Sequence, residues 1–432
     1  MTPSARLAAA IEILDELARG DAPIRDVLAG YFRKRRYAGS KDRAAIRARV
    51  YDVVRDLSLL KWKLVRAAGD ADRPRNWVFA ACASEGADIA SLFSGNGYAP
   101  AALDTAETSL AEVLAAREQD DAELPDAVRY GCPDWLEAHF RASLGDDFVA
   151  ELAALNRTAP VDLRVDLSRA SRNAVRKGLE AAGIEAEPTP FSPAGLRLSG
   201  HADLKNVAPF REGLIEPQDE GSQMLALAVG AVPGERIVDY CAGAGGKTLA
   251  LASAMTGQGR IVACDVSAAR LRRMSPRLER AGVAAMVEFH EISAGGTGEP
   301  LPPETADRVL VDAPCSGTGT WRRHPFQRWR VTPSSLAEVV RVQQQVLERA
   351  AQLVRPGGRL VYATCSLLDV ENREQADRFA GSHADFTRLA ADECLPAFVR
   401  PDMVTSQGDL RLTPARHGTD GVYAALFERK AA

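Results

Sequence analysis

Two cysteines carry the clearest potential for chemistry in this sequence. Cys315 and Cys365 each follow an apolar segment typical of a strand, and each stands in a loop of Ser, Thr, Gly or Pro residues. A cysteine thiolate is a strong nucleophile. Because the carboxyl ends of parallel strands meet at one edge of a sheet, we expect both thiols to lie at that edge.

The other cysteines suggest no second reactive pair. Cys241 lies in a glycine-rich segment, and the rest are interpreted as small buried hydrophobic side chains: Cys82, Cys132, Cys264 and Cys394. The seven cysteines are odd in number, widely spaced and free of Cys-x-x-Cys pairs. This spacing argues against a disulfide framework and against a structural zinc site, so we expect no bound metal.

A glycine-rich loop connects a predicted strand to a predicted helix. It comprises Cys241, Ala242, Gly243, Ala244, Gly245 and Gly246, with Lys247 next in the chain. Glycines at this position let the backbone approach a ligand at the edge of an open α/β sheet. A Walker A loop would require glycine in place of Cys241, and a dinucleotide fingerprint would require glycine in place of Thr248.

Asp265 ends the next predicted strand. A carboxylate there can bind ribose hydroxyls, or it can cap the helix that follows. We favour cofactor binding because the glycine loop lies upstream at the corresponding strand end.

Apolar segments alternate with amphipathic segments throughout the C-terminal half. The expected strands are 236–240, 261–265, 309–312 and 360–364, and the expected helices are 247–255, 268–280 and 333–354. This alternation predicts an α/β fold with a largely parallel, doubly wound sheet.

The N-terminal half has different patterns. Helical periodicity covers the first 60 residues, whereas short strands are expected near 161–166 and 196–198. An acidic, proline-bearing stretch at 119–125 suggests a boundary. We therefore expect a helical domain at 1–130, a small α+β module at 131–212 and the α/β domain at 213–432.

The composition limits the location and partners of the protein. No apolar run approaches the roughly 18 residues of a membrane span, and the N-terminus lacks the apolar core of a signal peptide, so we expect a cytoplasmic protein. A net charge of −4 means that any nucleic-acid surface must be a local basic patch. Two basic clusters have the necessary charge: residues 33–36, and then Lys41, Arg43, Arg47 and Arg49. A solvated helix face is the commoner explanation of such clusters.

Four segments resemble the motifs of the Nop/Sun family of RNA cytosine-5 methyltransferases. Residues 239–248 resemble its cofactor loop, and 216–223 resemble the segment before its Rossmann-like domain. Asp312-Ala-Pro-Cys-Ser-Gly and Thr364-Cys-Ser resemble its two cysteine motifs. The resemblance implies a class I methyltransferase Rossmann-like fold, S-adenosylmethionine as cofactor, and methylation at C5 of a cytidine in RNA.

The resemblance assigns a role to each candidate catalytic residue. Cys365 is expected to add to C6 of cytosine, so that C5 can accept the methyl group. Cys315 is expected to help release the product. Asp312 is expected to bond N3 and the exocyclic amine, and Lys247 to bond the pyrimidine or to support the thiolate.

The resemblance also implies cofactor contacts from loop residues 241–247, Asp265 and Asp312. Glu291 stands where the family usually has an aspartate that meets the adenine edge, and Arg270 fits an Arg-Leu pair typical of the family. Ala244 stands where many members have proline.

The front half resembles two RNA-binding modules. Residues 39–55 resemble the middle of a NusB-like helical domain, which marks the bacterial small-subunit ribosomal RNA branch of the family. Residues 135–211 resemble a small RNA-recognition-like module. We therefore expect a monomer that acts on small-subunit ribosomal RNA without a membrane partner.

Three alternatives stay open. The first keeps the chemistry and takes transfer RNA or large-subunit ribosomal RNA as substrate. The second is a non-enzymatic RNA-binding ribosome-assembly factor, which the two cysteine motifs disfavour. The third is a nicotinamide-dependent oxidoreductase, which the missing third glycine disfavours.

Overall fold

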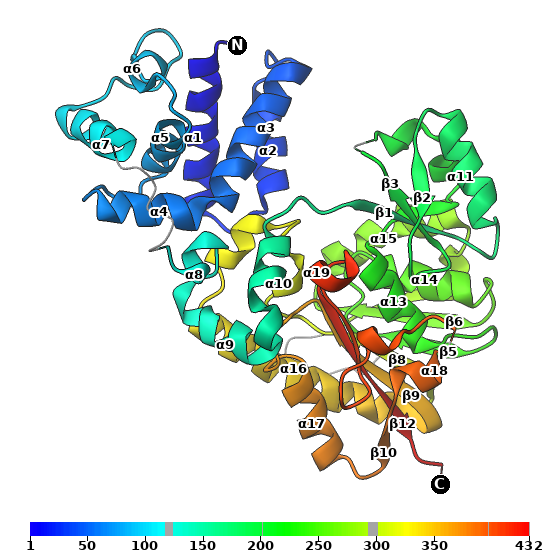
Figure 1. Ribbon diagram of the computed structural model, residues 1–432. Helices are drawn as coiled ribbons and strands as arrows, with labels where there is room; N and C mark the ends of the chain where they lie inside the picture. The colour runs from blue at the N-terminus through cyan, green and yellow to red at the C-terminus, as the bar shows by residue number, and fades with distance from the viewer. Residues whose placement is uncertain (117–123, 201, 293–300, 396, 432) are drawn as a thin grey trace. The chain divides into compact units, whose positions relative to one another are not determined.

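The computed structural model describes residues 1–116, 124–200, 202–292, 301–395 and 397–431, which form two compact units (Figure 1). Unit 1 comprises Met1–Arg141, Gly145–Arg157 and Trp321–Val331; unit 2 comprises Ala142–Leu144, Thr158–Thr320 and Thr332–Ala432. Most of the acidic stretch at 119–125 lies outside the described residues. No helix in the described ranges is both long and apolar enough to cross a membrane.

Unit 1 is helical. Its first helix begins at Pro3, where Thr2 accepts a hydrogen bond from the Ala5 amide and caps the first turn. Apolar residues of α1 such as Ile13 and Leu14 are fully buried in the core of this unit. The helices are α1 (Pro3–Arg19), α2 (Ile24–Lys34), α3 (Ser40–Arg55), α4 (Leu57–Arg66), α5 (Pro74–Ser84), α6 (Ile89–Leu92), α7 (Thr105–Ala116), α8 (Asp126–Arg129), α9 (Asp134–Leu144) and α10 (Phe148–Leu155).

A short segment from much later in the chain completes unit 1. Phe326 is buried in the core of this unit, and Arg328 is fully buried and donates to the carbonyl oxygen of Gly131 at 3.0 Å. Arg330 donates to carbonyl oxygens at the end of α1, where a helix leaves acceptors unsatisfied. Those carbonyls belong to Leu17, Gly20, Asp21 and Ala22. Residues 321–331 therefore belong to the helical unit in space, although α/β elements flank them in sequence.

Unit 2 contains a small antiparallel sheet with the order β2-β3-β1-β4. Leu163, Leu196, Val175 and Leu179 form its apolar core against one helix. The elements are β1 (Val161–Val165), α11 (Arg172–Ala181), β2 (Ala186–Pro188), β3 (Gly195–Leu198), α12 (Ala208–Arg211) and β4 (Ile215–Pro217). The strands expected near 161–166 and 196–198 are confirmed.

Unit 2 also contains an eight-stranded sheet with the order β10-β12-β9-β8-β5-β6-β7, and β11 pairs with β12. The strands from β9 to β7 run parallel, whereas β12 is antiparallel to β9 and β10. The strands are β5 (Arg236–Asp239), β6 (Arg260–Asp265), β7 (Val287–Glu291), β8 (Ala306–Asp312), β9 (Val354–Thr364), β10 (Phe386–Leu389), β11 (Leu410–Leu412) and β12 (Val422–Arg429). The predicted α/β class with a largely parallel sheet is confirmed.

The helices of this part are α13 (Glu220–Val229), α14 (Gly246–Ala254), α15 (Ala268–Ala281), α16 (Pro333–Leu353), α17 (Arg373–Ser382), α18 (Ala391–Cys394) and α19 (Pro414–His417). The three helices that the sequence predicted, α14, α15 and α16, match their expected bounds within one residue at each end. Two strands begin earlier than expected: β8 begins at Ala306 and not at Val309, and β9 begins at Val354, directly after α16, and not at Leu360. The first residues of β9 include Pro356 and Gly357, which are typical of turns, and the pairing with β8 shifts register there.

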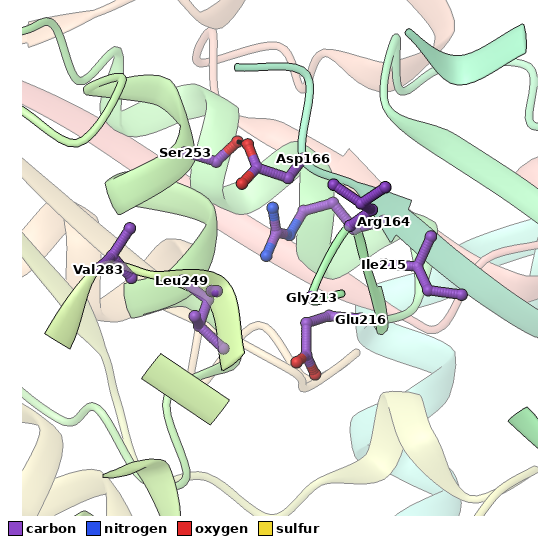
Figure 2. A pocket seen from close by; sticks show the side chains of 10 residues that line it. Arg164, Asp166, Gly213, Ile215, Glu216, Leu249, Ser253 and Val283 are labelled. Carbon is purple, nitrogen blue, oxygen red and sulfur yellow. Dashed lines mark hydrogen bonds between the residues drawn. The ribbon is translucent and has the colours of Figure 1, made fainter. Parts of the chain in front are cut away.

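A partly buried hydrogen bond joins Asp166, which directly follows β1, to α14. Ser253 donates to the Asp166 carboxylate at 2.6 Å, and burial lowers the pKa of Arg164 to about 10. Figure 2 shows these side chains around a cavity of about 10 Å³, with Glu216 and Leu249 on the other walls. This volume is roughly that of one water molecule, so the cavity is too small for a cofactor.

Asp239 ends β5 inside the large sheet. Its side chain is fully buried and accepts a hydrogen bond from the Thr248 hydroxyl at 2.7 Å. Burial raises the pKa of Asp239 to about 7, and the nearby Asp312 acts in the same direction. The folded protein therefore holds a proton on Asp239 at a pH where the unfolded chain has released it.

We predict that Asp239→Asn makes the free energy of unfolding less dependent on pH. The raised pKa stabilises the fold below about pH 4, and this stabilisation is lost as the pH rises through about 7. The variant should lack this loss, which is up to roughly 4 kcal/mol for a shift of this size. Urea unfolding at several pH values between 4 and 8 measures the difference.

Asp307→Asn is the matched control. Although burial opposes the shift, hydrogen bonds from the Arg236 amide and the Arg355 guanidinium lower the pKa of Asp307. Its contribution is therefore constant between pH 5 and 8. The prediction for Asp239 fails if its variant and the wild type lose stability in parallel over this range.

Candidate active site

Four parallel strands of the large sheet end in polar residues at one edge. Asp239, Asp265, Asp312 and Thr364 are the last residues of β5, β6, β8 and β9. The chain runs outward from β5 through β6 to β7 and then returns to the other side of β5 at β8. Such a point of reversal, here between β5 and β8, is where open α/β sheets bind ligands.

The two cysteines expected to react lie in contact at this edge. The sulfur atoms of Cys315 and Cys365 are 3.2 Å apart, although the residues are fifty positions apart in sequence, and both side chains are partly exposed. The strands cause this proximity because β8 and β9 are parallel neighbours, with Asp312 paired to Ala363. The amide of Gly319 also donates to the Cys365 carbonyl at 3.0 Å and ties the two loops together.

The surroundings favour a neutral thiol at Cys315. The hydrogen bond with Cys365 raises the pKa of Cys315 well above its ordinary value, and burial adds to this effect. The negative charge of Glu371 acts in the same direction. Cys315 can therefore donate its proton toward the sulfur of Cys365.

Lys247 and Asp312 form an ion pair across the point of reversal. The ammonium of Lys247, at the start of α14, lies 2.7 Å from a carboxylate oxygen of Asp312 at the end of β8. Although burial opposes the charge, Asp312 raises the pKa of Lys247, and a thiolate at Cys365 acts in the same direction. A permanent positive charge therefore lies in the electrostatic environment of Cys365.

The glycine loop packs against the end of β6. The amide of Gly243 donates to Asp265 at 3.0 Å, and the other oxygen of Asp265 accepts from the Ser267 amide at 2.8 Å. The helix cap is Ser267, whose side chain accepts from the Arg270 amide. Asp265 thus fixes the loop and retains lone pairs on both oxygens for a ligand.

The remaining predicted cofactor residues divide into two groups. Cys241, Ala242 and Gly243 are partly exposed and Ala244 is exposed, so this part of the loop presents its surface to a ligand. Glu291 ends β7 opposite Asp265 in register, and Arg270 lies 3.9 Å from the Asp265 carboxylate; both side chains are exposed. Both therefore lie at the periphery of the glycine loop.

The interpretation of Cys82, Cys132 and Cys264 as buried structural residues is confirmed. Burial raises the pKa of Cys82 to about 11 and of Cys132 to about 12, so neither is a thiolate at neutral pH. Cys394 differs from expectation because it is partly exposed; it ends α18 and packs one side against the core. Among the described residues no cluster of three or more His, Cys, Asp or Glu side chains could hold a metal.

Sequence reasoning missed two features of this site. Val266 follows Asp265 and is 64 % exposed, so an apolar side chain stands beside the carboxylate at the strand end. Glu371 is fully buried and hydrogen-bonded to both cysteine loops. The role of Glu371 was not visible in the sequence because it precedes the helix that begins at Arg373. Acidic residues are common before helices, where they interact favourably with the helix dipole.

Two glycines let the Cys315 loop touch the C-terminal hairpin. The Gly421 amide donates to the Gly319 carbonyl at 2.9 Å. A Cβ atom on Gly319 would lie 2.1 Å from the carbonyl oxygen of Gly421, which no side chain tolerates. The position of this loop therefore depends on the absence of a side chain at Gly319.

We predict that Gly319→Ala reduces the methyl transfer implied by the motif resemblance at least tenfold and destabilises the protein by about 1–3 kcal/mol, because the backbone must move away from the added methyl group. Thermal unfolding and incorporation of labelled methyl groups measure the two effects. Gly381→Ala on α17 is the control, since nothing lies within 4 Å of its added Cβ atom. Equal activity in both variants would show that the glycine contact does not position the loop.

The large sheet, with β12 antiparallel to β9, places the chain among Rossmann-like methyltransferases. A crystal structure of a methyltransferase homolog protein from Pyrococcus horikoshii matches it with a TM-score of 0.61 and 27 % identity, covering 70 % of this chain and 97 % of that one. The crystal structure of PH0851 matches with a TM-score of 0.79 and 26 % identity, covering 99 % of both chains.

Sequence comparison gives the family. Residues 226–428 match the model of the 16S rRNA methyltransferase RsmB/F family, and residues 132–205 match its ferredoxin-like domain. A probable ribosomal RNA small subunit methyltransferase B of Synechocystis is 35 % identical over 72 % of this chain and 69 % of its own length. The Vibrio cholerae ribosomal RNA small subunit methyltransferase B is 32 % identical over 71 % and 67 %. The chain belongs to the RsmB/F family of RNA methyltransferases, which confirms the resemblance drawn from the four motifs.

Proposed function

We propose that this protein transfers a methyl group from S-adenosylmethionine to C5 of a cytidine in small-subunit ribosomal RNA, with Cys365 as the nucleophile. The observation that carries the proposal is the 3.2 Å contact between the sulfur atoms of Cys315 and Cys365 beside the glycine loop. The names of the curated relatives support the substrate. The family match supports the class of reaction.

The residues present fit the cofactor. The partly exposed loop from Cys241 to Gly243 lies between β5 and α14, and the free lone pairs of Asp265 suit ribose hydroxyls. The exposed side chain of Val266 offers an apolar surface to an adenine ring. When bound there, S-adenosylmethionine supplies the methyl group that cytosine C5 accepts.

The side chains at the strand ends have complementary tasks in this reaction. The thiolate of Cys365 adds to C6, and the electron pair of the C5–C6 double bond makes C5 nucleophilic. The Asp312 carboxylate accepts hydrogen bonds from the exocyclic amine and from a proton at N3, while Lys247 holds Asp312 in place. After methylation the C5 proton passes to solvent water, the electron pair of the C5–H bond re-forms the C5–C6 double bond, and the sulfur of Cys365 leaves C6 as a thiolate that can accept a hydrogen bond from the Cys315 thiol. Cys315 assists this release as the neighbouring thiol.

The basic clusters of unit 1 supply charge for binding RNA. Arg35, Arg43 and Arg49 are engaged within the protein, by Glu12, the Ala38 carbonyl and Glu85 respectively. The exposed cations that remain are Arg33, Lys34, Arg36, Lys41 and Arg47. Tyr37 lies among them and is 71 % exposed, so an aromatic ring is available for a base. Binding through these cations should weaken as salt is raised.

The cysteine roles give opposite predictions for two variants. Cys365→Ala should abolish both methyl transfer and any covalent complex, because no thiolate can add to C6. Cys315→Ala should accumulate a covalent protein–RNA complex, because the adduct forms and is not released. Denaturing gels of each variant with labelled S-adenosylmethionine and transcribed small-subunit ribosomal RNA measure both effects. A complex trapped by Cys365→Ala would reverse the two roles.

The substrate assignment predicts a change in cellular RNA. Deleting the gene should remove 5-methylcytosine from a cytidine of small-subunit ribosomal RNA and leave transfer RNA and large-subunit ribosomal RNA unaltered. Bisulfite sequencing of total RNA from the deletion strain and its parent measures this. Expression of the Cys365→Ala variant is the control and should not restore the mark. Loss of methylation only from another RNA class would refute the ribosomal substrate.

A further inference from the structure

Glu371 is a buried carboxylate that touches both cysteine loops. It lies between β9 and α17 and is fully buried. One oxygen accepts from the Ser316 amide at 2.7 Å, and the other accepts from the Ser316 hydroxyl at 2.5 Å and from the Ser366 hydroxyl. Ser316 follows Cys315 and Ser366 follows Cys365, so one carboxylate holds the residue after each thiol.

The hydrogen bonds around Glu371 suit an ionised carboxylate. The side-chain amide of Gln343 donates to it at 3.1 Å and also donates to the Pro314 carbonyl at 2.9 Å. The carboxylate thus receives four hydrogen bonds, about as many as an ionised carboxylate accepts. None of these four donors carries a positive charge. The negative charge of Glu371 is therefore solvated by the protein and not cancelled by an ion pair with these donors.

The two thiols have charges of opposite sign in their surroundings. The carboxylate of Glu371 acts on Cys315 and raises its pKa, after the larger effects of the Cys365 hydrogen bond, burial and the charge of Cys365. The ammonium of Lys247 interacts with Cys365. An anion disfavours a thiolate and a cation favours it, so these charges distinguish two side chains that share one chemistry.

We propose that Glu371 is a positioning residue that assigns the two cysteines their roles, holding both loops at contact distance and keeping Cys315 protonated so that Cys365 is the nucleophile. This inference rests on the cysteine roles proposed above. Asn372 supports the arrangement from the next position: its amide donates to the Ser366 carbonyl at 2.9 Å, and its oxygen accepts from the Thr364 hydroxyl. The residues on either side of Cys365 are thus held as well.

Glu371→Gln tests the charge while keeping the contacts. The amide oxygen can replace the carboxylate oxygen that accepts from Ser316 N–H and Gln343, and the amide nitrogen can donate to the two serine hydroxyls. Limiting iodoacetamide, followed by mass spectrometry of the peptides, reports which cysteine reacts first. In the wild type Cys365 should react first. In the variant, the rate of alkylation of Cys315 relative to Cys365 should rise at least threefold at pH 8. The pH at which Cys315 reaches half of its maximal alkylation rate should fall by about one unit.

Turnover supplies the second readout. We expect Glu371→Gln to reduce kcat about tenfold. In the variant the negative charge lies part of the time on Cys315, which does not add to C6, and therefore less often on Cys365. Glu374→Gln is the matched control, since Glu374 is exposed in the first turn of α17. That variant should keep the wild-type order of alkylation and the wild-type kcat.

The outcomes separate this inference from the proposed function. A wild type that reacts at Cys365 and a Glu371→Gln variant with the same ratio and midpoint would overturn the role of Glu371 alone. A wild type that reacts first at Cys315 would overturn the assignment of the nucleophile as well. Absence of RNA methylation would leave the alkylation result standing.

Ser366→Ala provides a second test if Glu371→Gln fails to fold. This variant keeps the carboxylate and removes one of its donors, so the charge near Cys315 is less screened. Cys315 should remain the slower thiol, and its rate relative to Cys365 should not rise. A rise to equal rates would show that the hydroxyl contacts, and not the charge of Glu371, set the order.

Discussion

The contact between the sulfur atoms of Cys315 and Cys365 is the constraint on which the rest of the site depends. In the proposed reaction, a nucleophile that is later eliminated and a second thiol that assists its departure have to reach one pyrimidine ring. Two neighbouring parallel strands bring the two thiols together, since β8 and β9 end side by side and each cysteine lies within three residues of the end of its strand. A register change of one residue would turn the flanking side chains to opposite faces.

An ion pair and a buried carboxylate lie around this contact. The ion pair of Asp312 with Lys247 bridges the point of reversal in the sheet. The ammonium of Lys247 thus holds the carboxylate that is proposed to bind the cytosine base. Glu371 lies among uncharged donors on the other side of the thiols. Low-dielectric surroundings strengthen both effects, because neither Lys247 nor Glu371 is well exposed to water. The negative charge of Glu371 thereby adds to the raised pKa of Cys315.

Distant parts of the chain hold the loops in this arrangement. The C-terminal hairpin reaches the Cys315 loop through the contact of Gly319 with Gly421. Immediately after that loop, residues 321–331 enter the core of the helical unit, where Arg328 and Arg330 satisfy backbone carbonyls. The Cys315 loop is thus continuous in the chain with a segment anchored in the helical unit.

The sequence by itself determined the α/β class, the positions of the central parallel strands β5, β6, β8 and β9 and of the helices α14, α15 and α16, and the two thiols at the strand ends, because hydrophobic periodicity and strand-end motifs are local signals. It did not reveal the early start of β9, whose Pro356 and Gly357 are typical of turns, nor the membership of residues 321–331 in the helical unit. Nor did it reveal Glu371, since one acidic residue before a helix is ordinary in sequence. Only the tertiary structure decided that this carboxylate lies between Ser316 and Ser366, because burial and contacts across fifty residues are properties of packing.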